Sequence, residues 1–210
     1  MPTPTVESNS GSHCLEQGVV VAFKEWALVC DSMLKGETSL VFRKGGIAEG
    51  RAGFRFKHQR FFLFPTYFHE QAGSLRLAAP VTVGEAPPEV TIQGLAQVEF
   101  TSWVDDLGKL APLSGLHILR DRVLEQRFQY SEPKGLYLAF VRVFRWERPW
   151  RFPSQRSFGG CRSWLELPGV PPDAELVPVL SEEEQTKRRD QVRALFPVES
   201  EGEDGVGVMG

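Results

Sequence analysis

The stretch VTIQGLAQVEFTSWV, residues 90–104, decides the fold class, because its β-branched and aromatic residues predict a long β-strand. One glycine, Gly94, interrupts the pattern and predicts a β-bulge. A second stretch, GLYLAFVRVFRW at 135–146, begins as an unbroken apolar run, which is typical of a strand buried on both faces. Two long strands of this kind favour a protein dominated by its sheet.

Shorter patterns on either side of these strands predict the remaining elements. Strands are expected at 39–43, at 54–64 ending before Pro65, more weakly at 75–83, and at 163–167. Helices are expected at 22–34, ending before Gly36, at 114–128, and at 181–196, where Ser181 and Glu184 form a capping box. The expected fold class is therefore α+β, with a strand-dominated, curled or barrel-like mixed sheet, two or three packed helices and a charged C-terminal helix.

The chain of 210 residues is long enough for one sizeable core. We predict a single α+β domain over 19–170, a Pro-rich linker at 171–180 and the charged helix at 181–197. Residues 1–18 are polar and turn-rich and residues 198–210 are acidic and glycine-rich, so both tails are expected to be disordered. The absence of a run of about 18 apolar residues and of a signal-peptide pattern predicts a cytoplasmic protein without a membrane span.

The net charge of −3 conceals two basic windows. Residues 43–60 and 142–162 each contain six Lys or Arg and one Glu, with aromatic residues between the basic ones. This pattern is typical of single-stranded nucleic-acid binding, in which cations contact phosphates and bases stack on aromatic rings. The alternative is a strand with an aromatic core face and a solvated arginine face. The alternation at 54–57 favours that alternative, whereas RWERPWRFPSQR at 145–156 predicts a crowded loop.

The loop RKGGIAEGRAGF, residues 43–54, is close to the phosphate-binding loop of nucleotide hydrolases. Arg51 stands where that loop needs lysine, Ala52 offers no hydroxyl for magnesium, and a strand pattern follows instead of a helix. We therefore reject a nucleotide-hydrolysing site and predict a glycine hairpin whose arginines can still bind an anion. The candidate nucleic-acid or anion-binding residues of the two windows are Arg43, Lys44, Arg51, Arg55, Lys57, Arg60, Arg145, Arg148, Trp150 and Arg151.

Four residues are candidates for catalysis, and each also has a purely structural interpretation. His69 and Glu70 follow Pro65 in a predicted loop, where an acid or base can stand, and His117 begins a predicted helix. Cys161 lies between glycines and Arg162, which can lower the pKa of a thiol. No histidine or cysteine spacing suits a metal, so neither a metal nor another cofactor is expected.

A metal-dependent nuclease of the restriction type is weakly supported by the sequence. Such an enzyme needs a strand that carries Asp or Glu, one further residue and Lys. The one Glu-x-Lys tripeptide, at 132–134, has proline in its middle, which suits a turn.

Five segments occur in the same order in a known family. They are AFKEWALVCDSMLKGE (22–37), LVFRKGGIAEG (40–50), FKHQRFFLFPTYFHEQ (56–71), LSGLHIL (113–119) and SFGGCRSWLEL (157–167). Over about Ala22 to Leu167 the chain resembles the bacterial domain-of-unknown-function family numbered 1802. The family's function is not established, so the resemblance implies a bacterial protein and assigns no chemistry.

These observations favour an accessory nucleic-acid-binding domain that contacts phosphates through the two basic windows. The alternative is an enzyme acting on a small anionic or phosphate-bearing substrate, with His69 as acid or base. The expected partner is nucleic acid or another phosphate-bearing ligand, and the oligomeric state is left open. The decisive question is whether Arg43, Arg51, His69, His117 and Cys161 converge on one surface.

Overall fold

The computed structural model describes residues 20–44, 56–169 and 175–197 of the chain. The tails at 1–18 and 198–210, which the sequence predicts to be disordered, lie outside the described residues, as does most of the glycine loop. In the described part, no helix is long and apolar enough to span a membrane.

Seven strands of the described part form one sheet, whose path runs β2-β5-β4-β3-β1-β6 with β7 beside β5. β1 and β3 are parallel and the other pairs are antiparallel, so the sheet is mixed. The strands are β1 (Val21–Trp26), β2 (Leu40–Arg43), β3 (Arg60–Thr66), β4 (Glu89–Val104), β5 (Leu136–Pro153), β6 (Trp164–Glu166) and β7 (Leu176–Pro178). The expectation of a strand-rich α+β fold with a mixed sheet is confirmed.

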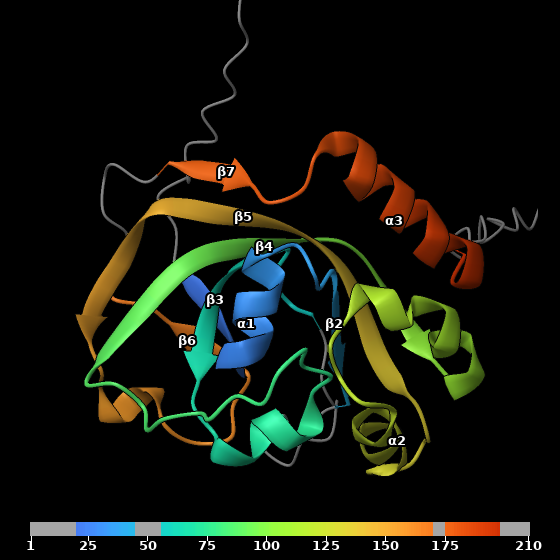
Figure 1. The fold of residues 1–210 in the computed structure, drawn as a ribbon, viewed down its shortest axis with the longest axis horizontal. Helices are drawn as coiled ribbons and strands as arrows, with labels where there is room; N and C mark the ends of the chain where they lie inside the picture. Colours follow the sequence, from blue (N-terminus) through green and yellow to red (C-terminus); the bar gives the residue numbers. More distant parts are fainter. Residues whose placement is uncertain (1–19, 45–55, 170–174, 198–210) are drawn as a thin grey trace, which may run out of the picture.

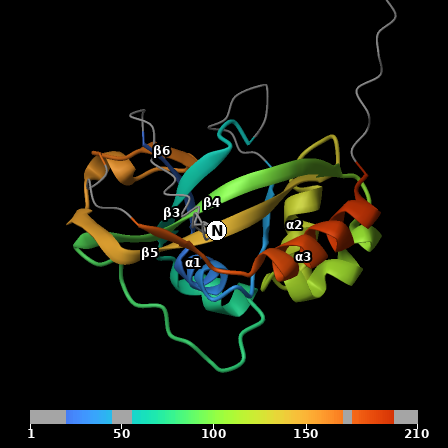
Figure 2. The same ribbon diagram turned by 90° about the horizontal axis from the view of Figure 1, so that it is seen from above.

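Helices cover the sheet on both sides. The α-helices are α1 (Ala27–Leu34), α2 (Asp121–Gln129) and α3 (Glu182–Leu195), and the 3-10 helices are η2 (His69–Ser74), η3 (Leu107–Leu116) and η4 (Arg156–Phe158). Figure 1 shows α1 beneath the arch of β4 and β5, and α3 above it. Figure 2 shows α2 and α3 near one end of the sheet and β6 near the other. The middle of β5 is therefore buried on both faces, as its apolar run predicts.

The long strand β4 matches the predicted stretch 90–104 and pairs with β5 along most of its length. The register between the two strands shifts between Ile92 and Gly94, so the predicted bulge is confirmed. A Cβ atom at Gly94 would collide with the carbonyl oxygen of Phe144, which explains why glycine is needed there. Bulges increase local twist, and Figure 1 shows β4 and β5 arching over α1, whose Leu34 side chain a Cβ atom at Gly94 would also meet.

The sheet is curled but does not close, so the barrel-like part of the expectation is wrong. β6 pairs with β1 over Val21 to Phe23 only, which leaves the end of β1 as an open edge. Closure would need a continuous backbone ladder between this edge and β2. Instead, the Arg43 side chain of β2 donates a 2.7 Å hydrogen bond to the Lys24 carbonyl of β1. Side chains therefore bridge this gap, which we call the seam.

The predicted helix at 22–34 is only partly correct, because its first residues form β1 and α1 begins at Ala27. Phe23 and Trp26 are three residues apart, which fits a helix, but β1 finds backbone partners on both β3 and β6. Tertiary pairing thus overrides the local pattern. Trp26, with ψ of 137°, is still extended and is the last residue before the helix.

Two of the predicted strands also differ in the structure. The expected strand at 75–83 is absent from the described residues, apart from a bridge between Leu75 and Leu119. β3 begins only at Arg60 and includes Pro65. The proline is tolerated because β4 pairs with β3 over Arg60 to Phe62 only, which leaves one side of β3 unpaired at Pro65.

The predicted helix at 114–128 is divided, because η3 ends at Leu116 and α2 begins at Asp121. The predicted linker at 171–180 contains β7, which pairs with β5. The residues between η3 and α2 bond to the segment 74–76, and β7 bonds to β5, so both differences arise from long-range contacts that local composition does not show.

The helix α3 packs against the sheet through polar as well as apolar contacts. Ser181 Oγ accepts a 3.2 Å hydrogen bond from the Glu184 N–H, as a capping box requires. The buried amide of Gln185 donates to the Glu99 carboxylate at 2.9 Å and to the Val141 carbonyl at 3.3 Å. These bonds connect α3 to β4 and to β5.

Candidate functional site

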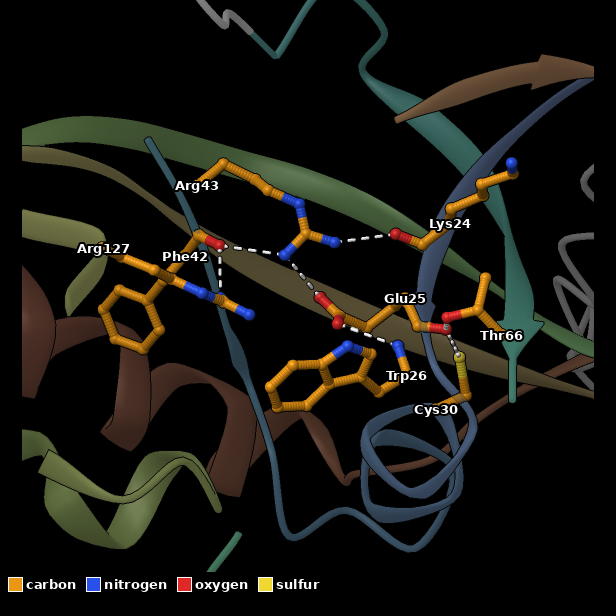
Figure 3. A network of polar contacts seen from close by, with 8 residues as sticks. All are labelled: Lys24, Glu25, Trp26, Cys30, Phe42, Arg43, Thr66 and Arg127. Carbon is orange, nitrogen blue, oxygen red and sulfur yellow. Dashed lines mark hydrogen bonds and ion pairs between the residues drawn. The ribbon is translucent and has the colours of Figure 1, made fainter. Parts of the chain in front are cut away.

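The seam between β1 and β2 contains a buried ion pair (Figure 3). Glu25 is only 4% exposed, and one of its carboxylate oxygens lies 2.9 Å from the Arg43 guanidinium. The other oxygen accepts a hydrogen bond from the Trp26 N–H at 2.9 Å. Arg43 also donates to the Lys24 carbonyl and, at 3.0 Å, to the Phe42 carbonyl. Both charged groups are thus held in place and neutralise each other.

A second guanidinium, that of Arg127 from α2, reaches the same seam. It donates to the Phe42 carbonyl at 2.9 Å, and its carbon lies 5.3 Å from the centre of a Trp26 ring. Burial and the charge of Arg43 lower the pKa of Arg127 to about 10, and Glu25 acts in the opposite direction. Of these two guanidiniums, that of Arg43 forms the ion pair with Glu25 and that of Arg127 contacts a carbonyl, so the seam keeps an excess positive charge.

A cavity of about 640 Å³ opens beside the seam, and we call it the seam pocket. Its walls come from β1, the end of β2, α2 and the segment 160–163. The charged residues that line it are Lys24, Glu25, Arg43, Lys44, Arg127 and Arg162. Five cations and one carboxylate around one cavity make a strongly positive concave surface.

The cations of the seam pocket are held in place mostly without being neutralised. Lys24 Nζ donates to the carbonyls of Gly159 and Gly160, at 3.2 and 3.0 Å. Arg162 donates to the Ser157 carbonyl at 3.1 Å, and Lys44 donates to a backbone carbonyl as well. Within the described ranges, Arg43 alone among the five has a carboxylate partner. Carbonyl oxygens orient a cation but leave its full charge available to a ligand.

The pKa values of the two lysines in this cluster are lowered by their surroundings. Burial lowers the pKa of Lys24, and the charge of Arg162 lowers it further, while Cys161 acts in the opposite direction. Burial likewise lowers the pKa of Lys44, against the effect of Glu132. A bound anion would stabilise the charged form of each lysine.

Exposed aromatic side chains stand at the rim of the seam pocket. Phe68 is 45% exposed and Tyr130 is 62% exposed, and both line the cavity. Trp26 lines it closer to the seam. Large exposed rings beside fixed cations can stack against a planar group that carries a phosphate.

The family to which this sequence belongs is shown by comparison with known families. Residues 22–191 match the family described as "Domain of unknown function (DUF1802)". The chain belongs to the DUF1802 family. The match covers most of the chain, including the seam pocket, and it confirms the resemblance carried by the sequence motifs.

The solved structures that match this DUF1802 protein are distant from it. The crystal structure of ASCH from Zymomonas mobilis has a TM-score of 0.42 and 13% identity, and the match covers 81% of this chain and 92% of that chain. A point mutant of the ASCH protein from the same organism has a TM-score of 0.43 and 12% identity, covering 82% and 94%. None of the curated proteins matches the sequence. The function of this DUF1802 domain must therefore be argued from its own pocket.

The first basic window contributes two of its residues to the seam pocket of the DUF1802 domain, Arg43 and Lys44. Arg43 is already engaged by Glu25, so it helps to build the pocket wall. Arg51 and Arg55 lie outside the described residues. Of the remaining two, Lys57 is exposed and Arg60 is half-buried at the start of β3, and neither lines the cavity.

The second basic window is a strand, so the expectation of a loop at 145–156 is wrong. β5 continues to Pro153. Its Trp146 and Phe152 side chains are buried in one hydrophobic cluster with Phe62. Arg145 donates to the Leu34 carbonyl at the C-terminal end of α1, where a cation is favoured by the helix dipole. The aromatic residues of this window thus belong to the core.

The other residues predicted in this window lie apart from the seam pocket. Trp150 is half-buried, and the centre of one of its rings lies 4.7 Å from the centre of the Phe152 ring. Arg148 and Arg151 are exposed on the same strand, and neither lines the cavity.

The four predicted catalytic residues do not converge. Cys161 is exposed and lines the seam pocket, whereas His69 and Glu70 belong to η2, and His69 is not part of the pocket lining. His117 is buried against the edge of the Phe42 ring, 5.1 Å between ring centres. Among the described residues, no group of three or more His, Cys, Asp or Glu is arranged to hold a metal ion.

His117 should make the stability of the DUF1802 domain depend on pH. Burial and the charge of Arg76 lower the pKa of His117 to about 4. Between about pH 6.5 and about pH 4, His117 is therefore protonated in the unfolded chain but neutral in the folded protein. Through this group the free energy of unfolding should fall by about 2 to 3 kcal/mol between pH 7 and 4.5. Urea titrations at both pH values measure it.

The His117→Gln variant is the control for this effect, because other carboxyl groups titrate in the same range. The variant should be less stable than wild type at pH 7, and the difference should shrink by about 2 kcal/mol at pH 4.5. Parallel pH profiles of the two proteins would contradict a neutral, buried His117.

Sequence reasoning missed three key residues of the seam pocket, Lys24, Glu25 and Arg127. A helix at 22–34 would place Lys24 and Glu25 on its solvated face. The available signal was their position inside the apolar run VVVAFKEWALVC, where two adjacent charges in a strand need partners. For Arg127, in a polar amphipathic helix, no local signal distinguishes a pocket residue from a solvated one.

Proposed function

We propose that this DUF1802 domain binds single-stranded nucleic acid, and that the seam pocket receives one nucleotide unit of it. The observation that carries the proposal is the set of cations fixed by neutral carbonyls, Lys24, Arg127 and Arg162 among them. Their geometry is set before a ligand arrives, so little ordering entropy is lost on binding. The exposed rings of Phe68 and Tyr130 supply stacking surfaces at the rim.

The size of the pocket suits this ligand. A volume of about 640 Å³ falls within the range of about 300–1,000 Å³ that is usual for small-molecule sites. A charge-assisted hydrogen bond contributes about 1.5–3 kcal/mol, and stacking contributes about 1–3 kcal/mol per base. A nucleotide can gain both contributions here, whereas a simple anion gains only the first.

An enzyme acting on a small phosphate-bearing substrate has less support. His69, the predicted acid or base, lies outside the set of residues that line the seam pocket. Cys161 lines the cavity, but the described residues place no histidine beside it there to act as a base. Binding therefore accounts for the pocket more fully than catalysis does.

Replacing Arg127 should weaken nucleic-acid binding. We expect Arg127→Gln to raise the Kd for a fluorescein-labelled oligothymidylate by about 10- to 100-fold, because a charge-assisted contact is lost. Fluorescence anisotropy at about 50 and 200 mM salt measures the effect. The plot of log K against log salt should also become less steep by about 0.7, the value for one phosphate contact on a single strand.

The matched control is Arg148→Gln, which removes an exposed arginine of β5 that does not line the pocket. Its Kd should stay within about threefold of wild type, because an exposed charge away from the ligand is largely screened. Equal losses in the two variants would point to a diffuse electrostatic surface. No wild-type binding at about 50 mM salt would refute the proposed function.

A further inference from the structure

The seam pocket has one buried end and one exposed end. Its floor is the Glu25–Arg43 ion pair, whose side chains are 4% and 16% exposed. The Thr66 hydroxyl donates to the Glu25 carbonyl at 2.9 Å and lines the same cavity. The rim carries Phe68 and Tyr130, which are among the most exposed large apolar side chains of the described chain. The lining of the pocket therefore runs from buried charged side chains to exposed aromatic ones.

The excess positive charge lies at the floor as well as on the walls. Arg127 and Arg43 meet at the Phe42 carbonyl, and Glu25 compensates only one of them. Lys24 and Arg162 stand near the segment 160–163 of the wall, and carbonyl oxygens hold them. The floor is thus a site for a compact, highly charged anion.

Two kinds of phosphate in a nucleic acid differ in this respect. A phosphodiester inside the chain carries one negative charge, and the chain must continue on both sides of it. A phosphomonoester at a chain end carries close to two charges at neutral pH and three acceptor oxygens, and the chain continues on one side only. A concave site with an uncompensated guanidinium beside its buried ion pair fits the second kind, because the extra positive charge can balance the second negative charge of the ligand.

We propose that the seam pocket recognises the phosphorylated terminus of a single strand, with the phosphomonoester at the floor beside Arg127 and the terminal base against the aromatic rim. This inference rests on the proposed function and goes beyond it, because it assigns the ligand a free, phosphorylated end. Either the 5′ or the 3′ phosphate has this chemistry, and the experiment below distinguishes them.

The experiment compares four oligothymidylates of about ten nucleotides in an anisotropy competition assay with the full-length protein. The first carries a 5′ phosphate, the second a 3′ phosphate and the third hydroxyls at both ends. The fourth is covalently closed into a circle and has no ends. We expect one phosphorylated oligonucleotide to compete at least about tenfold better than the hydroxyl-ended one, because it adds a charge-assisted contact. The circle should compete no better than the hydroxyl-ended strand.

The variants connect this preference to the pocket. Arg127→Gln should abolish the preference for the phosphorylated end, whereas Arg148→Gln should retain it. Equal competition by all four oligonucleotides would overturn recognition of the terminus while leaving single-strand binding intact. Failure of all four to bind would overturn the proposed function together with this inference.

Discussion

Glu25→Gln is expected to lower the free energy of unfolding by about 3 to 5 kcal/mol, because it leaves the Arg43 guanidinium, which lies close to Arg127, without its compensating charge. Glu25 is 4% exposed and lies 2.9 Å from Arg43, and burial lowers the pKa of the neighbouring Arg127 to about 10. Without the carboxylate, both arginines would remain charged, partly desolvated and close together. Urea denaturation followed by circular dichroism measures the loss.

The control for this variant is Glu147→Gln, which neutralises an exposed carboxylate of β5. It should change the free energy of unfolding by less than about 0.5 kcal/mol. Combining Glu25→Gln with Arg43→Gln should recover part of the loss, since one uncompensated charge disappears. A Glu25→Gln protein as stable as the Glu147→Gln control would contradict the importance of the ion pair.

The same substitution should have the opposite effect on binding. In the absence of urea, at a temperature where the Glu25→Gln variant is folded, its pocket carries one more net positive charge than the pocket of the wild type. Oligonucleotide affinity should therefore be equal or higher, despite the lower stability. Under the proposed function, Glu25 would thus stabilise the seam while weakening the positive field that attracts the ligand.

Phe140→Ala should destabilise the protein by about 3 to 5 kcal/mol, the usual range for a buried phenylalanine replaced by alanine. Phe140 is fully buried in β5, and its ring stacks on that of Phe100 with 5.4 Å between centres. Arg193 of α3 lies over the same Phe100 ring at 4.7 Å. The cavity left by Phe140→Ala would therefore weaken the packing of β4, β5 and α3 together.

A phenylalanine at the pocket rim offers the matched control. Phe68→Ala makes the same chemical change at a side chain that is 45% exposed, so it should cost less than about 1 kcal/mol in the same urea titration. It should nevertheless weaken oligonucleotide binding by about 5- to 100-fold if a base stacks there. Equal destabilisation by Phe68→Ala and Phe140→Ala would contradict the burial described for β5.

Much of the sheet could be predicted from short-range patterns. The stretch at 90–104 becomes β4, Gly94 becomes a bulge, and the Ser181 side chain caps α3. Each of these depends on residues close together in the chain, such as a hydroxyl three residues before an N–H. The failure at 22–34 has the opposite cause, because β1 is a strand only through its pairing with β3 and β6.

The sequence by itself determined the strand-rich fold class, the two long central strands and the excess of cations near Arg43. The tertiary structure alone decided which cations line the seam pocket. Glu25, Arg43 and Arg127 come from β1, β2 and α2, and they meet because the sheet curls without closing. Whether an arginine is neutralised by a carboxylate or only oriented by a carbonyl depends on this long-range geometry, and no local pattern of residues contains it.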